Sequence, residues 1–166
     1  MTSRRALTSL AALVLTGTVT SAQAPVAAPP PTPYGPSIGI EASKRVAAAS
    51  VAEARKNGWY MAIAIVDPAG DLVYFEKMDN TQAASVAIAI DKARSSARFK
   101  RPTKAMQDVL ASGGEGLRFL ALQGAIPAEG GVPLIMDGKI VGAVGASGGA
   151  GNQDAQTAGA GAATVK

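Results

Sequence analysis

Three cationic side chains lie close together in a segment that the spacing of apolar residues predicts to be a helix over residues 82–99. They are Lys92, Arg94 and Arg98. A lysine or arginine that a helix presents to a ligand can bind an anion, for example a ligand carboxylate. For Lys92 a solvent-exposed side chain is the plainer interpretation, and both interpretations stay open. As an acid–base group, Lys92 would need a strongly shifted pKa, and no partner visible in the sequence supplies that shift.

The chain contains no histidine and no cysteine. This excludes Ser-His-Asp and Cys-His catalysis, histidine-ligated zinc, c-type haem and haem held by a proximal histidine. It also excludes disulfides, so packing and assembly must stabilise the fold. Two strand tyrosines and four methionines remain as candidate ligands for iron, although both residue types more often serve in packing. They are Tyr60, Tyr74, Met61, Met78, Met106 and Met136.

A glycine-rich segment, residues 130–151, contains two apolar runs joined by Asp137-Gly138. This dipeptide is typical of the type I′ turn of a β-hairpin, because both positions tolerate a positive φ. The second run, residues 139–147, is rich in glycine and alanine, which indicates that a helix, a strand or a ligand comes very close. Residues 145–151 also resemble a phosphate-binding loop, but they lack its Gly-Lys-Ser/Thr ending and follow an antiparallel hairpin. We therefore expect no bound nucleotide.

The first 22 residues are typical of a signal peptide that is removed on export. Arg4 and Arg5 form the basic start, residues 6–19 form an uncharged apolar run, and small residues then offer a cleavage site after Ala22. The arginine pair fits an ordinary leader or a twin-arginine leader, and the sequence leaves both open. The apolar run is short for a membrane span. We expect a periplasmic or secreted protein without a membrane anchor after cleavage.

Residues 23–37 are rich in proline and are expected to form an extended tether ahead of a single domain, residues 38–166. Removal of the two leader arginines lowers the formal net charge from +4 to +2. A nearly neutral chain without a basic run is a poor candidate for nucleic-acid binding.

The periodicity of the remaining chain predicts two β-hairpins, with helices before, between and after them. The first hairpin comprises residues 60–66 and 71–78, and its first strand alternates large apolar residues with alanines. The second hairpin is the glycine-rich segment. The expected helices are residues 40–56, 82–99, 103–110, 115–123 and 153–165, of which the fourth can also be irregular. This order, αββααββα, predicts an α+β layer sandwich of the profilin or PAS type, with one antiparallel sheet flanked by helices.

The helix expected over residues 82–99 carries two stripes. The apolar stripe, which should face the sheet, consists of Val86, Ile90, Ala93 and Ala97. The opposite, partly polar stripe consists of Ile88, Lys92, Ser95 and Phe99. A small domain rich in alanine gains little from each buried residue, so a second copy packed on Ile88, Ser95 and Phe99 would stabilise it. We expect at least a dimer, unless this face binds a ligand.

Five sequence elements occur in a recognisable order over residues 40–163. They are Ile65-Val66-Asp67-Pro68-Ala69-Gly70 with Leu72-Val73; Phe75 with Lys77-Met78-Asp79; Asp91-Lys92-Ala93-Arg94 with Phe99, Pro102 and Thr103; residues 130–134; and residues 142–148. Together they resemble the signature of the GlcG/HbpS-like proteins, small haem-binding modules that include the corrinoid-binding C-terminal domain of PduO. Many relatives carry histidine at the position of Asp71, so this chain cannot bind a tetrapyrrole through that histidine.

The resemblance implies an exported haem-binding protein that forms a dimer or a larger oligomer, with Thr103 on the iron side. Iron would be ligated weakly, by Thr103, by a tyrosine or by a methionine. Such ligation suits haem storage, haem turnover or oxidative-stress protection better than electron transfer, and weak haem-degrading activity is compatible with it. No zinc is expected.

In this interpretation the macrocycle lies in an apolar crevice and the propionates are bound by basic residues. The crevice residues are Val132, Pro133 and Leu134, and the basic residues are Lys92, Arg94 and Arg98. Two other functions stay open. One is an enzyme acting on a small acidic metabolite, with Lys92 or a carboxylate as the acid–base group. The other is a ligand-free oligomeric module for interaction or sensing.

Overall fold

The computed structural model describes residues 30–166. The predicted signal peptide, residues 1–22, and the first part of the predicted tether lie outside the described residues. The helices are α1 (Ile40–Lys56), α2 (Ser85–Phe99), α3 (Thr103–Ala111), the 3₁₀ helix η1 (Gly114–Leu120) and α4 (Gly151–Ala162). The strands are β1 (Ala62–Val66), β2 (Leu72–Lys77), β3 (Gly131–Met136) and β4 (Lys139–Ser147).

The four strands form one antiparallel sheet in the order β2-β1-β4-β3. The two predicted hairpins are therefore joined through their inner strands, β1 and β4, which are buried almost throughout. At the tip of the second hairpin Asp137 and Gly138 both have positive φ values, +49° and +72°, as the turn prediction requires. The predicted α+β fold, an antiparallel sheet of two hairpins flanked by helices, is confirmed.

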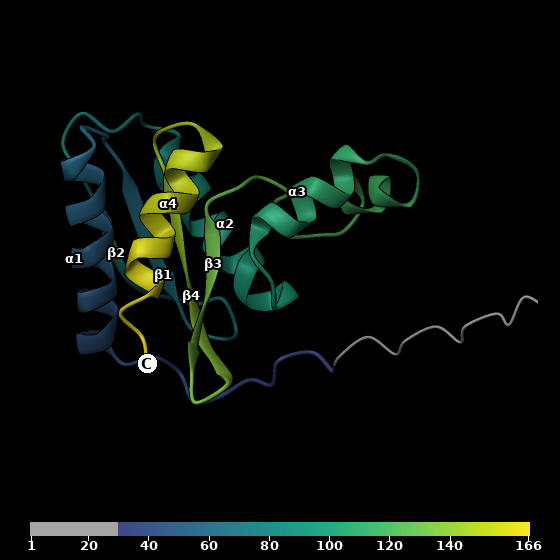
Figure 1. Cartoon of the computed structure of the whole chain (residues 1–166), viewed down its shortest axis with the longest axis horizontal. Coiled ribbons are helices and arrows are strands. Elements are labelled where there is room, and N and C mark those ends of the chain that lie inside the picture. Colours follow the sequence, from purple (N-terminus) through teal and green to yellow (C-terminus); the bar gives the residue numbers. More distant parts are fainter. Residues whose placement is uncertain (1–29) are drawn as a thin grey trace, which may run out of the picture. The chain divides into compact units, whose positions relative to one another are not determined.

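Helices cover both faces of the sheet (Figure 1). Ile63 and Ile65 of β1, together with Met61 just before the strand, pack with α1 and α4 in a core of large side chains. The intervening residues Ala62 and Ala64 point to the other face, where they meet a row of alanines from α2. Because side chains alternate along a strand, one strand supplies both cores, as its sequence predicts.

The alanine-rich core brings α2 very close to the sheet. A Cβ atom built on Gly145 of β4 would lie 2.6 Å from Ala93 N and even nearer to Ala89 O, both in the backbone of α2. Only glycine fits at this position, which explains the glycine and alanine content of the second apolar run.

Helix α2 begins at Ser85, three residues later than predicted, and its orientation differs from the predicted one. Ala93 and Ala97 face the sheet as expected, but Ile90 lies at the margin of that contact, and both Val86 and Ile90 are only half-buried. Lys92, which the helical pattern assigns to the opposite stripe, is buried on the sheet side. The pattern failed here because Ser85, Ala89 and Ser96, small residues with little apolar signal, form much of the buried face.

The segment formed by α3 and η1 projects away from the sheet (Figure 1) and is called the arm below. Met106 and Phe119 are buried within the arm, whereas Leu117 and Leu120 are exposed. Leu120 is the more exposed of the two, at 72%. None of the helices in residues 30–166 is long and apolar enough to cross a membrane.

The folded unit starts earlier than the predicted boundary at residue 38. Residues 33–38, called the strap below, run along β4 beyond the point where β1 stops pairing with it. Ile140 N donates to Pro33 O at 2.9 Å, Gly35 N donates to Ile140 O at 2.8 Å, and Ile38 N donates to Val141 O at 2.8 Å. The last residues of the predicted tether are thus paired with the start of β4, where they provide partners for backbone groups that β1 does not reach.

Candidate functional site

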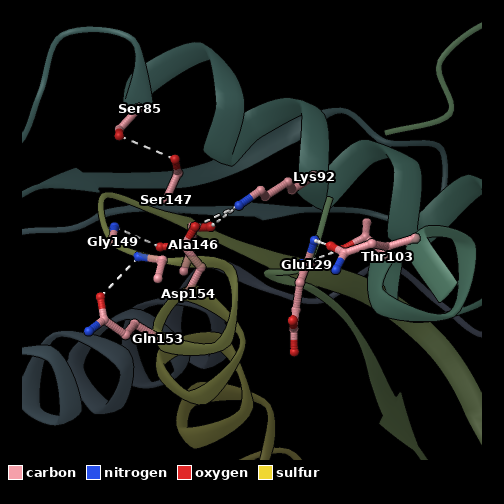
Figure 2. A network of polar contacts seen from close by, with 12 residues as sticks. Ser85, Lys92, Thr103, Glu129, Ala146, Ser147, Gly149, Gln153 and Asp154 are labelled. Carbon is pink, nitrogen blue, oxygen red and sulfur yellow. Dashed lines mark hydrogen bonds and ion pairs between the residues drawn. The ribbon is translucent and has the colours of Figure 1, made fainter. Parts of the chain in front are cut away.

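A buried ion pair connects the helical layers on the two faces of the sheet (Figure 2). Lys92 of α2 donates from Nζ to Asp154 Oδ2 of α4 at 2.7 Å, and the two side chains are 5% and 4% exposed. A longer contact, 3.4 Å, joins Lys92 Nζ to Ala146 O. The other carboxylate oxygen of Asp154 accepts a hydrogen bond from Gly149 N at 3.0 Å. Lys92 is therefore neither the solvent-exposed lysine nor a free anion-binding group.

Burial raises the pKa of Asp154 above its usual value, while Lys92 and the amide of Gly149 act in the opposite direction. Desolvation penalises the charged carboxylate, and the paired ammonium compensates for part of this cost. The pair is thus a place where removal of one partner leaves an uncompensated group in the interior.

The start of β3 passes directly beside this pair. A Cβ atom on Gly130 would lie 2.9 Å from Lys92 Nζ and 2.8 Å from Asp154 Cβ, so no side chain fits there. At the next residue, Gly131 N donates to Thr103 Oγ1 at 2.9 Å, and a Cβ atom would lie 2.7 Å from Thr103 Cγ2. The Gly-Gly pair of the sequence signature therefore separates Thr103 from the Lys92–Asp154 ion pair.

The glycine loop before α4 already uses two of its amide groups. Gly149 N donates to Asp154, and Ala150 N donates to Gln153 Oε1 at 2.9 Å (Figure 2). In a phosphate-binding loop such amides would point to the ligand. Here the close-packing interpretation of the loop accounts for both of them.

Arg94 and Arg98 line an open cavity of about 660 Å³ together with Asp91 and three residues of the loop that follows η1. Arg94 donates from Nε to Gly70 O at 3.1 Å, and Arg98 donates from Nε to Ala69 O at 2.7 Å. The turn of the first hairpin thus holds both guanidinium groups by one edge. Their remaining N–H groups suit carboxylate ligands, which arginine binds through two parallel hydrogen bonds. The three loop residues are Gln123, Gly124 and Ile126.

Of the predicted site residues, Arg94 and Arg98 are the two that line this cavity. Lys92 and Thr103 are buried and do not line the cavity. Val132 and Leu134 pack towards the core formed with α1 and α4, and Leu134 is fully buried there. Pro133 lies between them in β3 and points to the opposite face. Because adjacent residues of a strand point to opposite faces, these three residues do not form one wall, and a haem-binding role for them stays a prediction.

The other candidate iron ligands lie away from the cavity beside Arg94 and Arg98, and two of them, Tyr60 and Met78, line a second cavity. Tyr74 donates to Glu76 Oε2 at 3.4 Å, and Tyr60 is exposed at the edge of this second cavity. Met61 and Met106 are fully buried. Within residues 30–166 no three acidic side chains gather in a way that could hold a metal ion.

The face of α2 proposed for dimerisation is partly covered by the chain itself. Ser95 is buried: its Oγ accepts a hydrogen bond from Ile126 N at 2.9 Å and donates to Met106 Sδ at 3.8 Å. Ser95 therefore cannot contribute to an interface between copies. Ile88 remains exposed and Phe99 is half-buried, so assembly through these two residues stays a prediction.

Two parts of this region were missed by the analysis of the sequence. Asp154 follows a glycine loop and carries no local sign that it pairs with Lys92, which lies 62 residues earlier. The loop wall of the cavity, residues 123–126, lacks regular structure, and no periodicity points to it. Both depend on contacts between segments that are distant in the chain.

Comparisons with known proteins agree with this fold. A sequence model of the family described as haem-degrading proteins, HbpS-like, matches residues 38–163. The protein GlcG of Escherichia coli K12 is 38% identical over 102 residues, which cover 61% of this chain and 75% of GlcG. A solved variant of Streptomyces reticuli HbpS is 29% identical with a TM-score of 0.73, over 87% of this chain and 99% of that one. A structure described as a PduOC:haem complex has a TM-score of 0.71 at 24% identity, over 78% and 96% of the two chains, and shares the fold.

Proposed function

Because the chain belongs to the family of haem-degrading, HbpS-like proteins, we propose that it binds haem and that Arg94 and Arg98 hold the haem propionates. The observation that carries this proposal is the pair of arginines, anchored by the Ala69-Gly70 turn, on one wall of the cavity. Family membership supports haem as the ligand, and the cavity supports the place of its carboxylates.

The residues around the cavity suit the carboxylate end of haem. Each arginine is held at Nε, so its orientation is set before a ligand arrives and less side-chain entropy is lost on binding. Asp91 Oδ1 lies 3.7 Å from Arg94 Nη1 in a half-exposed ion pair on the same wall of the cavity. Ile126 offers an apolar contact on the loop side, and three exposed leucines lie in η1 and at the start of this loop. These leucines are Leu117, Leu120 and Leu122.

The iron side is less well matched to the residues present. Thr103, which the resemblance places there, is fully buried and its Oγ1 accepts the amide hydrogen of Gly131. Bound haem would supply the redox chemistry of iron, and this chain offers it only weak oxygen or sulfur ligands. Weak ligation favours storage or slow turnover of haem, and the description of the family supports turnover as the second candidate function.

The alternative of an enzyme with Lys92 as its acid–base group is not proposed further. The ammonium of Lys92 is bonded to Asp154 inside the protein and does not reach the cavity. A general acid or base must come within hydrogen-bonding distance of its substrate, which Lys92 does not.

Replacement of Arg98 by Gln is expected to weaken haemin binding by about 10-fold or more, because a hydrogen bond to a charged group contributes about 1.5–3 kcal/mol. Haemin dimethyl ester, which lacks the carboxylates, should bind the variant and the wild type equally. The measurement is titration with each compound, followed by the saturable shift of the Soret band. Arg45→Gln, in α1 on the opposite face of the sheet, is the control and should match the wild type. Unchanged haemin affinity in Arg98→Gln would contradict the proposed site.

We also propose that the protein is exported to the periplasm or beyond, on the strength of the leader-like residues 1–22. Protein recovered outside the cytoplasm should begin at Gln23, as read by N-terminal sequencing. An Arg4→Lys/Arg5→Lys variant should still be exported if the leader is of the ordinary type, and should stay inside if it is a twin-arginine leader. Wild-type protein that keeps Met1 and remains in the cytoplasm would contradict export.

A further inference from the structure

The strap adds a short parallel pairing to β4 just before the region that the family model matches, which begins at residue 38. Its hydrogen bonds satisfy the backbone of Ile140 and Val141, which β1 does not reach. Ile38 at its end is buried in the core with α1 and α4. The position of the strap is therefore defined at both ends by contacts with the folded domain.

Tyr34, in the strap, reaches across to the last turn of α2. Its hydroxyl donates to Ala97 O at 3.0 Å and lies 3.2 Å from Arg98 O. Carbonyl groups in the last turn of a helix lack the usual amide partners of the helix interior. Ala97 O accepts from Lys100 N at 3.3 Å, and the hydroxyl of Tyr34 adds a second donor at this end of α2. The ammonium of Lys100, the residue that ends α2 with a φ of +55°, lies 4.0 Å from the centre of the Tyr34 ring. A cation over an aromatic ring adds a second attraction at the same place.

Arg98 is thus held from two sides by segments far apart in the sequence. The hydroxyl of Tyr34 contacts its backbone carbonyl, and the turn of the first hairpin binds its side chain through Ala69 O. The absence of a side chain at Gly70 leaves room for this contact, because a Cβ atom there would lie 2.7 Å from Arg98 Nε. We propose that Tyr34 is a positioning residue for Arg98, and that the strap is a part of this chain that sets the geometry of the anion-binding end of α2.

The consequence for ligand binding rests on the proposed function, whereas the consequence for α2 does not. Without the hydroxyl of Tyr34, the last turn of α2 should open more often, and the guanidinium of Arg98 should sample more orientations. The proposal therefore predicts a local loosening at the end of α2 and a weaker interaction with carboxylates, with little change elsewhere.

The test is Tyr34→Phe in the full chain, which keeps the ring and removes only the hydroxyl. Hydrogen exchange should become faster at the amides of Lys100 and Arg101, which donate to Ala97 O and Ser96 O at the end of α2. Haemin affinity should fall roughly three- to tenfold, the effect of losing one hydrogen bond, while affinity for haemin dimethyl ester should not change. Ser112→Ala is the matched control, because the hydroxyl of Ser112 makes a similar bond to Val109 O at the end of α3. It should leave all three measurements as in the wild type.

Each outcome bears on a separate part of the proposal. Unchanged exchange at Lys100 and Arg101 overturns the positioning role, whether or not haemin binds. Faster exchange with an equal loss of affinity for haemin and for its dimethyl ester also overturns it, because a general structural effect would then explain both. Faster exchange in a protein that binds no haemin would contradict the proposed function and leave the contact between Tyr34 and α2 supported.

Discussion

Asp154→Asn is expected to lower the free energy of unfolding by about 3–5 kcal/mol, the usual cost of removing one partner of a buried ion pair. The variant leaves the ammonium of Lys92 without a counter-charge, at a position where both side chains are almost completely buried. It also weakens the acceptor for Gly149 N in the loop before α4. Because α2 and α4 lie on opposite faces of the sheet, the loss should destabilise the whole domain rather than one helix.

The measurement is urea unfolding at neutral pH, compared with Asp108→Asn. Asp108 pairs with Lys104 on the surface of α3, and loss of an exposed pair should cost about 1 kcal/mol or less. If Asp154→Asn is no more destabilising than this control, the buried pair has no special role in stability.

The complementary variant, Lys92→Met, should show a dependence on pH with a definite sign. Burial already raises the pKa of Asp154 in the wild type, and removal of the ammonium raises it further. A carboxyl group whose pKa is higher in the folded state stabilises the fold at low pH, and this contribution is lost as the pH rises through the folded-state value. Relative to the wild type, Lys92→Met should therefore be least destabilised in acid and most destabilised at neutral pH. A constant difference between pH 4 and 7 would contradict this explanation.

Gly145→Ala is expected to destabilise the domain by about 1–3 kcal/mol or more, the cost of overpacking a core. The added methyl group would meet the backbone of Ala89 and Ala93 in α2. Backbone atoms cannot move aside as the end of a flexible side chain can, so α2 must shift away from the sheet. Since α2 carries Arg94 and Arg98, haemin affinity should fall together with the melting temperature.

Gly159→Ala provides a control of opposite sign. Gly159 lies inside α4, and a Cβ atom there meets nothing within 4 Å. Alanine is favoured over glycine within a helix, so this variant should be more stable than the wild type by about 0.5–1 kcal/mol. Thermal unfolding of both variants measures the contrast. Equal stability of Gly145→Ala and the wild type would show that α2 does not depend on this close approach.

The amino-acid sequence by itself determined the features that depend on neighbouring residues. The alternation of Met61, Ile63 and Ile65 with alanines determined the two faces of β1, because side-chain direction along a strand follows directly from residue order. Asp137-Gly138 determined the hairpin turn through its tolerance of positive φ. The order of motifs was enough to recognise the family. Each of these inferences needs only a short stretch of chain or a comparison of residue order.

Only the tertiary structure decided which side of α2 faces the sheet and what meets it there. The burial of Lys92 runs against its hydrophilic character, and Asp154, 62 residues later in the chain, is what makes that burial possible. The predicted crevice residues in β3 lie on both faces of the strand, whereas the cavity beside Arg94 and Arg98 is closed by a loop without regular structure. Tyr34 was assigned to the tether because the proline-rich composition of residues 23–37 predicts an extended segment. That composition gives no sign that the start of β4, far away in the chain, offers backbone groups for this segment to pair with. The physical reason is common to all of these: a charge partner, a cavity wall and a backbone acceptor are set by spatial proximity between distant segments, which local sequence patterns do not encode.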